Sequence, residues 1–268
     1  MEKSGQPVDT HLQRHQSVPI MPWYSVTGIV LGALLLVSIP VVIWLVPWLR
    51  RSPRQKIIYG ALFRFGQGFF WLIHRYRGDG LEHRPQTRRP GKLLVVCNHS
   101  GSIDPFLVQF VCPFYIRWLT AANTVPWLFR PFVNYLGVLN ISRMSPDTAG
   151  LRQAIRLLND DQVLGIFPEG KIAVPPRQIG PFARGVGYLV KKTQSPVLLV
   201  WISGTPDTNK VLPSLLGPSH SSITFVDYLE FDPALTKLEI AQQLRERLHQ
   251  ASGWPLREDV QQPDKMHQ

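Results

Sequence analysis

His99 and Asp104 are the two residues of this sequence whose types and spacing best suit acid–base chemistry. They follow the apolar run KLLVVC (92–97), and the loop that contains them, NHSGSID, carries Gly101. Ligands gather at the carboxyl ends of strands in α/β sheets, where a carboxylate can orient an imidazole that acts as a base. On a regular helix the two side chains would lie about 140° apart. The pairing therefore predicts a turn, to which Gly101 contributes.

A second histidine stands at the same spacing from an aspartate. His74 and Asp79 belong to HRYRGD, which follows an aromatic stretch and has no apolar strand before it. We interpret this segment as a solvated, charged face at a membrane surface. Context therefore selects His99, for which the alternative role is that of a hydrogen-bonded structural histidine at a strand end.

Two further groups of residues follow apolar runs. In Phe167-Pro168-Glu169-Gly170-Lys171, proline and glycine flank a carboxylate and favour a tight loop that could hold Glu169 toward a polar ligand. The alternative is a turn with a solvated glutamate. The run GVLNISR ends with Arg143, whose planar guanidinium suits bidentate phosphate binding, although a lone arginine is more often a surface residue.

Strand and helix patterns alternate from residue 91 to about residue 250. Helix starts are indicated by Ser145-Pro146-Asp147, for a helix to about Asn159, and by Asp232-Pro233 before ALTKLEIAQQLRERLHQ. Several of the strand-like runs are apolar throughout, which favours burial on both faces. The pattern predicts an α/β fold with a mostly buried mixed sheet flanked by helices. The runs are 92–97, 115–120, 137–141, 162–167, 196–202 and 222–230.

A long apolar segment precedes this domain. Residues 23–49 contain no charge, and a helix of that length reaches about 40 Å, enough to cross a bilayer core of about 30 Å. We predict a transmembrane helix; a buried soluble helix and, because of Pro40 and Pro47, two short re-entrant legs are the alternatives. Five cations follow the segment and only Arg14 precedes it, which predicts that everything after residue 50 is cytoplasmic. The five are Arg50, Arg51, Arg54, Lys56 and Arg64.

The remaining segments complete the predicted organisation. Residues 57–73 are aromatic and carry a charge, a composition that favours an interfacial helix held by anionic lipid. The expected divisions are a disordered tail (1–22), the transmembrane helix (23–49), a basic interfacial helix and linker (50–90), the α/β domain (91–252) and a C-terminal tail (253–268).

Composition narrows the possible partners. The net charge of +11 with 44% hydrophobic residues excludes a disordered polycation and favours an anionic partner that carries phosphate. Nucleic acid is not expected, since no nucleic-acid-binding motif is recognisable. The two cysteines, Cys97 and Cys112, argue against a disulfide framework and fit a reducing compartment.

Taken in order, the motifs resemble those of the glycerolipid acyltransferases, most closely the bacterial 1-acylglycerol-3-phosphate acyltransferases. The family's N-H-x-x-x-x-D block matches Asn98, His99 and Asp104, and its G-x-I-x-I-x-R block matches Gly137 and Arg143. Its F-P-E-G block matches residues 167–170, and a looser Pro-Val block matches residues 196–200. The resemblance covers about residues 78 to 230.

The resemblance implies an acyltransferase in which His99 and Asp104 are catalytic. It implies an acyl-CoA or acyl carrier protein thioester as donor and a lysophospholipid as acceptor, with no metal or organic cofactor. Phosphate of the acceptor would be bound by Arg143 and Lys171. The loops around the substrate would include Asn98, Glu169 and Gly170.

The sequence departs from the family where F-P-E-G is commonly followed by Thr-Arg. Lys171 and Ile172 stand there instead, and a lysine is a point charge rather than a planar fork. Acylation of a lipid that lacks the phosphate, transacylation from another phospholipid, and a non-catalytic basic membrane-docking protein therefore remain alternatives. The aromatic segment from Phe106 to Tyr135 predicts an apolar groove for acyl chains, with ordinary core packing as the alternative.

Overall fold

The computed structural model describes residues 23–121, 139–141, 148–172, 175–208 and 210–257. The internal contacts of the chain divide it into two units, Met1–Pro47 and Trp48–Gln268. Helix α1 (Trp23–Arg50) provides the described part of the first unit, and its last residues belong to the second.

Helix α1 runs without interruption through Pro40 and Pro47. The span from Thr27 to Arg50 is long and apolar enough to cross a membrane by length and composition, and most of its apolar side chains are exposed. No second helix in the described residues meets that test. The segment therefore forms one continuous helix and not the two short re-entrant legs that were the alternative.

The second unit is built on a seven-stranded mixed sheet with the order β1-β7-β6-β2-β5-β3-β4. Strand β7 is antiparallel to β6, and every other neighbouring pair is parallel. The predicted mixed α/β sheet is confirmed, and β1, only three residues long, is the strand that the sequence patterns missed. The strands are β1 (Arg77–Asp79), β2 (Leu93–Cys97), β3 (Ile116–Ala121), β4 (Leu139–Ile141), β5 (Val163–Ile166), β6 (Val197–Ser203) and β7 (Ser222–Leu229).

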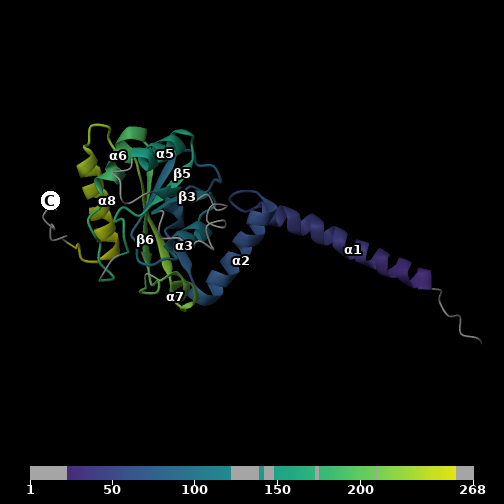
Figure 1. Ribbon diagram of the computed structural model, residues 1–268. Helices are drawn as coiled ribbons and strands as arrows, with labels where there is room; N and C mark the ends of the chain where they lie inside the picture. The colour runs from purple at the N-terminus through teal and green to yellow at the C-terminus, as the bar shows by residue number, and fades with distance from the viewer. Residues whose placement is uncertain (1–22, 122–138, 142–147, 173–174, 209, 258–268) are drawn as a thin grey trace, which may run out of the picture. The chain divides into compact units, whose positions relative to one another are not determined.

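Helices cover both faces of this sheet (Figure 1). One face carries α2 (Ile57–His74), α3 (Asp104–Val111) and α7 (Val211–Leu216). The other carries α5 (Thr148–Asn159), α6 (Arg184–Thr193) and α8 (Lys237–Ser252). The short 3-10 helix η1 (Leu81–His83) contacts β7.

The central strand β2 shows why the sheet sequences are apolar throughout. Leu93, Val95 and Cys97 pack with the α2–α3–α7 side, and Leu94 and Val96 pack with the α5–α6–α8 side. All five are fully buried, as expected for a strand with helices on both faces. The loop that carries the candidate catalytic residues therefore starts from a strand that is packed on both faces.

Helix α8 begins later than the sequence predicted. Asp232 does not cap it; its Oδ1 accepts from the Ala234 amide at 2.8 Å in a local turn. Thr236 is the N-cap, and it forms a reciprocal capping box with Glu239. The capping box satisfies two helix-terminal amides, which a Pro-based start at residue 233 would not do.

Two predicted flanking segments are part of the fold. Helix α2 buries Tyr59, Phe63 and Phe70 within the second unit while it exposes other apolar residues. After α8, the amide of Ile179 donates to the carbonyl of Pro255 at 3.0 Å, and the amide of Arg257 donates to that of Ile179 at 2.9 Å. The first residues of the predicted C-terminal tail, up to Arg257, are thus hydrogen-bonded to the segment around Ile179.

Candidate active site

Asn98 holds the start of the loop that follows β2. Its side-chain amide donates to the Ile202 carbonyl (2.8 Å) and accepts from the Ile202 amide (2.7 Å), so it continues the pairing of β2 with β6 beyond the last strand residue. It also donates to Ser100 Oγ at 2.8 Å. Asn98 is buried, and its hydrogen-bonding groups support the loop from within.

His99 and Asp104 meet across a tight turn. His99 Nδ1 lies 3.1 Å from Asp104 Oδ2, and the same oxygen accepts from the amides of Ser100 (2.7 Å) and Gly101 (2.9 Å). The turn closes where the Asp104 amide donates to the Gly101 carbonyl at 3.2 Å. The predicted fold-back between residues 99 and 104 is therefore present.

The burial of the two side chains differs in a way that suits a base and its orienting group. The Asp104 side chain is fully buried at the first residue of α3, whereas the His99 side chain is 20% exposed. With the carboxylate accepting from Nδ1–H, the unprotonated nitrogen of the neutral imidazole is Nε2. The arrangement can take a proton from a group that approaches His99.

Phe167 supports the imidazole from one side. Its ring stacks on His99 with centroids 4.2 Å apart and planes at 19°, and on its other side it stacks on Trp118 at 5.0 Å. Gly165 leaves room for Trp118, because a Cβ there would lie 2.6 Å from the indole. No spacing rule predicts this stack, although it fixes the ring plane and offers a π face to an imidazolium.

Glu169 links two loops through backbone donors. Its Oε1 accepts from the His99 amide (3.2 Å), and its Oε2 accepts from the Gly180 amide (2.9 Å). Burial raises the pKa of the Glu169 carboxyl, while these hydrogen bonds and nearby cations oppose the rise. Gly170, at a φ of +69°, completes the turn that places this carboxylate.

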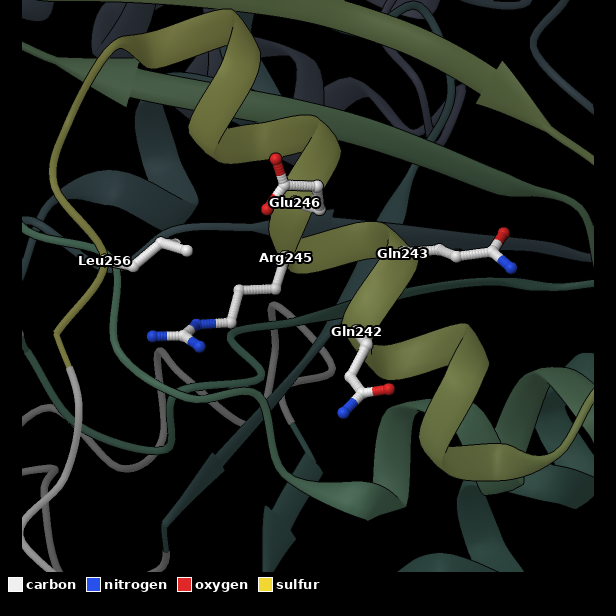
Figure 2. Close-up of a pocket in the computed structure, with 5 residues that line it drawn as sticks. All are labelled: Gln242, Gln243, Arg245, Glu246 and Leu256. Carbon is white, nitrogen blue, oxygen red and sulfur yellow. The ribbon is translucent and has the colours of Figure 1, made fainter.

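Arg245 of α8 supports the Gly180 segment from behind. Its Nε donates to the Gly180 carbonyl at 3.0 Å, and its guanidinium also reaches the carbonyl of Arg257. Figure 2 shows Arg245 extending from α8 in the direction of the strand-like segment that bears Leu256. The hollow in that view is lined by α8 and Leu256, and none of the predicted site residues lines it.

Of the two residues predicted to bind phosphate, Arg143 and Lys171, the structure describes only Lys171. Gly137 and Arg143 lie outside the described residues. Lys171 is exposed directly after the Glu169 turn. Arg184, also exposed, begins α6, and the preceding amide of Ala183 donates to the Pro168 carbonyl at 2.9 Å. Two cations therefore flank the F-P-E-G turn.

His74 corrects one prediction. It is fully buried rather than solvated, because the end of α2 lies against the segment that follows α7. Its Nε2 lies 3.1 Å from the Leu215 carbonyl, and its Nδ1 lies 2.9 Å from Ser219 Oγ. Asp79 instead pairs with Arg77 and accepts from Ser222 Oγ. The second H-x-x-x-x-D spacing therefore forms no dyad.

The aromatic segment contributes core where the structure describes it. Phe114 and Trp118 are buried, and Phe110 packs on Phe63 and Phe70 of α2 with ring centroids 5.5 and 5.1 Å apart. Four further aromatics of the predicted acyl groove, Trp127, Phe129, Phe132 and Tyr135, lie outside the described residues. The described part supports ordinary packing between α2 and α3.

A buried carboxylate contacts a partly exposed imidazole at the carboxyl edge of a mixed sheet, which is the geometry that base catalysis requires. Residues 75–203, which contain His99, Asp104 and Glu169, match the family model Acyltransferase. This match confirms the resemblance to acyltransferases that the motifs indicate.

Particular relatives agree with this assignment. The chain is 27% identical over 181 residues to a 1-acyl-sn-glycerol-3-phosphate acyltransferase of Borreliella burgdorferi. The aligned region covers 63% of this chain and 65% of the relative, a little under two thirds of its length. The crystal structure of the 1-acyl-sn-glycerophosphate acyltransferase PlsC of Thermotoga maritima superposes with a TM-score of 0.59 and 20% identity, covering 72% of this chain and 77% of that one. The fold is therefore shared with that enzyme.

Proposed function

We propose that this protein is a membrane O-acyltransferase that moves a fatty acyl chain from a thioester to the free hydroxyl of a lysophospholipid. The thioester is acyl-CoA or acyl carrier protein, and the acceptor is 1-acylglycerol-3-phosphate, which gives phosphatidate. The observation that carries the proposal is the 3.1 Å contact between His99 Nδ1 and Asp104 Oδ2 inside the family-matched region. The name of the Borreliella burgdorferi relative gives the same acceptor, 1-acyl-sn-glycerol-3-phosphate.

The chemistry follows from the dyad. His99 Nε2 takes the proton as the acceptor hydroxyl attacks the thioester carbonyl, and Asp104 stabilises the resulting imidazolium. When the tetrahedral intermediate collapses, the C–S bond breaks and the proton passes from His99 to the leaving thiolate. The new ester and a free thiol are the products, and no acyl-enzyme forms.

The surrounding residues have supporting roles in this proposal. Phe167 presents its ring face to His99, where a cation gains stabilisation as the proton is transferred. Asn98 and Glu169 fix the loop backbone on either side of His99. Arg143 and Lys171 bind the acceptor phosphate, with Arg184 a further cation beside the same turn.

Membrane attachment is the second part of the proposal. Helix α1 crosses the bilayer, α2 lies in the headgroup layer, and the catalytic domain faces the cytoplasm. The length and composition of α1 support the crossing, and the cations that follow it support the orientation.

The experiment that tests the proposal uses the purified full chain in lipid vesicles. Labelled acyl-CoA and acyl carrier protein are offered with 1-acylglycerol-3-phosphate and, in parallel, with a lysolipid that lacks the phosphate. We expect labelled phosphatidate and little product from the neutral acceptor. Labelled product from the neutral acceptor alone would favour the alternative of an acceptor without phosphate. No transfer from either donor would contradict the proposal that the protein is an acyltransferase.

Arg143→Ala and Lys171→Ala test the phosphate assignment in the same assay. Arg143→Ala is expected to raise the acceptor KM by about tenfold or more and leave the donor KM within about twofold. Lys171→Ala is expected to have a smaller effect in the same direction. Equal changes in both KM values would remove the phosphate-binding role.

A further inference from the structure

Helix α7 exposes three large apolar side chains. Leu212 and Leu216 are 59% and 58% exposed, and Val211 is exposed as well. Among the apolar residues of α7, Leu215 is the one that packs against the core on this side of the sheet. Exposed apolar groups that gather on one element indicate a surface that meets another apolar phase.

Hydrogen bonds hold α7 against the carboxyl end of α2. His74 contacts the Leu215 carbonyl, and the amide of Ser219 donates to the Ile73 carbonyl at 3.1 Å. Figure 1 shows α7 beside this end of α2. Trp71 and Leu72, at 67% and 66% exposed, lie within three residues of these bonds. The exposed apolar groups of α7 and of the end of α2 therefore lie on two elements that are hydrogen-bonded to each other, and together we call them the α2–α7 surface.

Cations border the α2–α7 surface. Between residues 50 and 77 there are seven Lys or Arg residues and no Asp or Glu. Lys210 is the N-cap of α7, and Arg75 contacts His220 just beyond it. The nearest acids in the sequence are Asp207, before α7, and Asp79, which is already paired with Arg77. Apolar groups with a cationic border match an anionic lipid surface.

The length of the connection keeps this surface near a membrane. Six residues, 51–56, separate the end of α1 at Arg50 from the start of α2 at Ile57, and an extended chain across them spans at most about 25 Å. With α1 across a bilayer, the first turn of α2 stays within that distance of it. A protein partner would have to compete with lipid that is already close by.

The loop before α7 also contacts the catalytic loop. A Cβ placed on Gly101 would lie 3.3 Å from both the Pro206 carbonyl and Thr205 Oγ1. The loop that leads into α7 is therefore packed against the loop that carries His99, which places α7 close to the dyad in the fold. A lysolipid that moves laterally in the membrane could reach the dyad without leaving the lipid surface.

We propose that α7 is a second lipid-contacting element, which inserts Leu212 and Leu216 into the headgroup and acyl boundary of an anionic bilayer beside α2. The proposal rests on the membrane attachment of α1 proposed above. It assigns to α7 the delivery of membrane-borne acceptor to the catalytic loop.

Site-specific fluorescence tests the contact in the full chain. Native Cys97 and Cys112 are buried, so a cysteine introduced at Leu212 or Leu216 can be labelled alone with a thiol-reactive bimane. Leu238→Cys on α8 is the matched control, because Leu238 is a leucine that is 42% exposed on the opposite side of the sheet. The labelled chains are reconstituted into vesicles of phosphatidylcholine with phosphatidylglycerol that contain a shallow nitroxide-labelled lipid.

We expect quenching at positions 212 and 216 to exceed that at position 238 by about threefold or more, and to fall when the anionic lipid is omitted. Equal quenching at all three positions, in chains that float with the vesicles, would overturn the role of α7. Chains that do not float with the vesicles would overturn the attachment by α1 and with it this inference.

Activity separates delivery of acceptor from catalysis. The double variant Leu212→Glu with Leu216→Glu is expected to lose about tenfold in rate on vesicle-borne acceptor and to stay within about twofold on a short-chain, water-soluble acceptor. Leu238→Glu is the control. Equal losses on both acceptors would overturn the delivery role. Should the wild type transfer no acyl chain, the proposed function fails, whereas the quenching still decides whether α7 meets lipid.

Discussion

Residues 74–79 and residues 99–104 both place a histidine five positions before an aspartate, yet only the second pair forms a dyad. After His99 the chain turns, and Asp104 returns at the start of α3 to meet the imidazole. After His74 the chain leaves α2 through Arg75, at a φ of +42°, and becomes the extended strand β1. A strand carries Asp79 away, so His74 bonds instead to the Leu215 carbonyl in α7 and to Ser219 just after it.

The difference teaches that the path between two residues decides what an H-x-x-x-x-D spacing does. In the 99–104 loop, two backbone amides donate short hydrogen bonds to one carboxylate oxygen of Asp104, and His99 remains partly exposed. The 74–79 segment has a buried histidine whose two ring nitrogens are both engaged by structural partners. One pair suits proton transfer, and the other suits the attachment of α2 to the domain.

The largest expected effect comes from removing one imidazole and not the other. His99→Ala is expected to lower kcat for acyl transfer by about 10³-fold or more, because no other group takes the hydroxyl proton. His74→Ala in the folded fraction should stay within about threefold of wild type. Rates are measured with purified full chains in vesicles. A dispensable His99 together with an essential His74 would reverse the comparison.

The carboxylates should differ in the same way, by somewhat less. Asp104→Asn is expected to lower kcat by about 10²- to 10³-fold, because an amide at this position no longer favours the productive tautomer of His99. Asp79→Asn removes an exposed ion pair with Arg77 and should leave kcat within about twofold. Steady-state assays of the two variants provide the check, and similar losses from both would contradict a dyad confined to residues 99–104.

A moderate effect is expected from the ring that supports only the first histidine. Phe167→Leu should lower kcat by about tenfold with little change in either KM, since the stacked face at 4.2 Å is lost. Phe167→Tyr keeps the ring and should restore most of the rate. If the leucine variant matches wild type while the tyrosine variant is impaired, the stack has no part in catalysis.

His74 should affect stability more than rate. His74→Ala removes a fully buried ring and its hydrogen bonds to the Leu215 carbonyl and Ser219 Oγ, and the free energy of unfolding should fall by about 2 kcal/mol. His83→Ala, which alters a half-exposed histidine, is the control. Thermal unfolding in detergent gives the comparison, and an unchanged Tm for His74→Ala would show that the buried contacts contribute nothing.

The same histidine gives a pH dependence with a defined sign. Burial lowers the pKa of His74 from 6.5, so the unfolded chain binds more protons than the folded chain in the range below that value. The contribution of neutral His74 is present above about pH 6.5 and is lost as the pH falls through the lowered folded-state pKa. The Tm difference between wild type and His74→Ala should shrink on acidification.

The sequence predicted the elements and the catalytic loop because their signals are local. The strand before Asn98 is apolar along its whole length, and Gly101 lies within the loop that must turn. Contacts between distant segments had no such signal. Nothing near His74 indicates that Ser219 will pack on it, and nothing near Phe167 indicates that Trp118 will stack beneath it.

Helix boundaries failed for a related reason. Asp232-Pro233 and Thr236 are both acceptable starts, and the reciprocal bond with Glu239 decided between them. Strand β1 has three residues and depends on its pairing with β7, so its sequence alone has no strand pattern. The fold could therefore be predicted where a segment determines its own structure, and not where a partner does.

The most direct test of the central claim is a double-mutant cycle on acyl transfer. If His99 and Asp104 act as one unit, Asp104→Ala should lower kcat no further in the His99→Ala background, and the double variant should lie within about twofold of His99→Ala. The same cycle is run with His74→Ala and Asp79→Ala. Neither of these single variants should lower kcat enough for an interaction between the two residues to appear. Losses from His99→Ala and Asp104→Ala that multiply would mean that the two residues act independently, and would contradict the account.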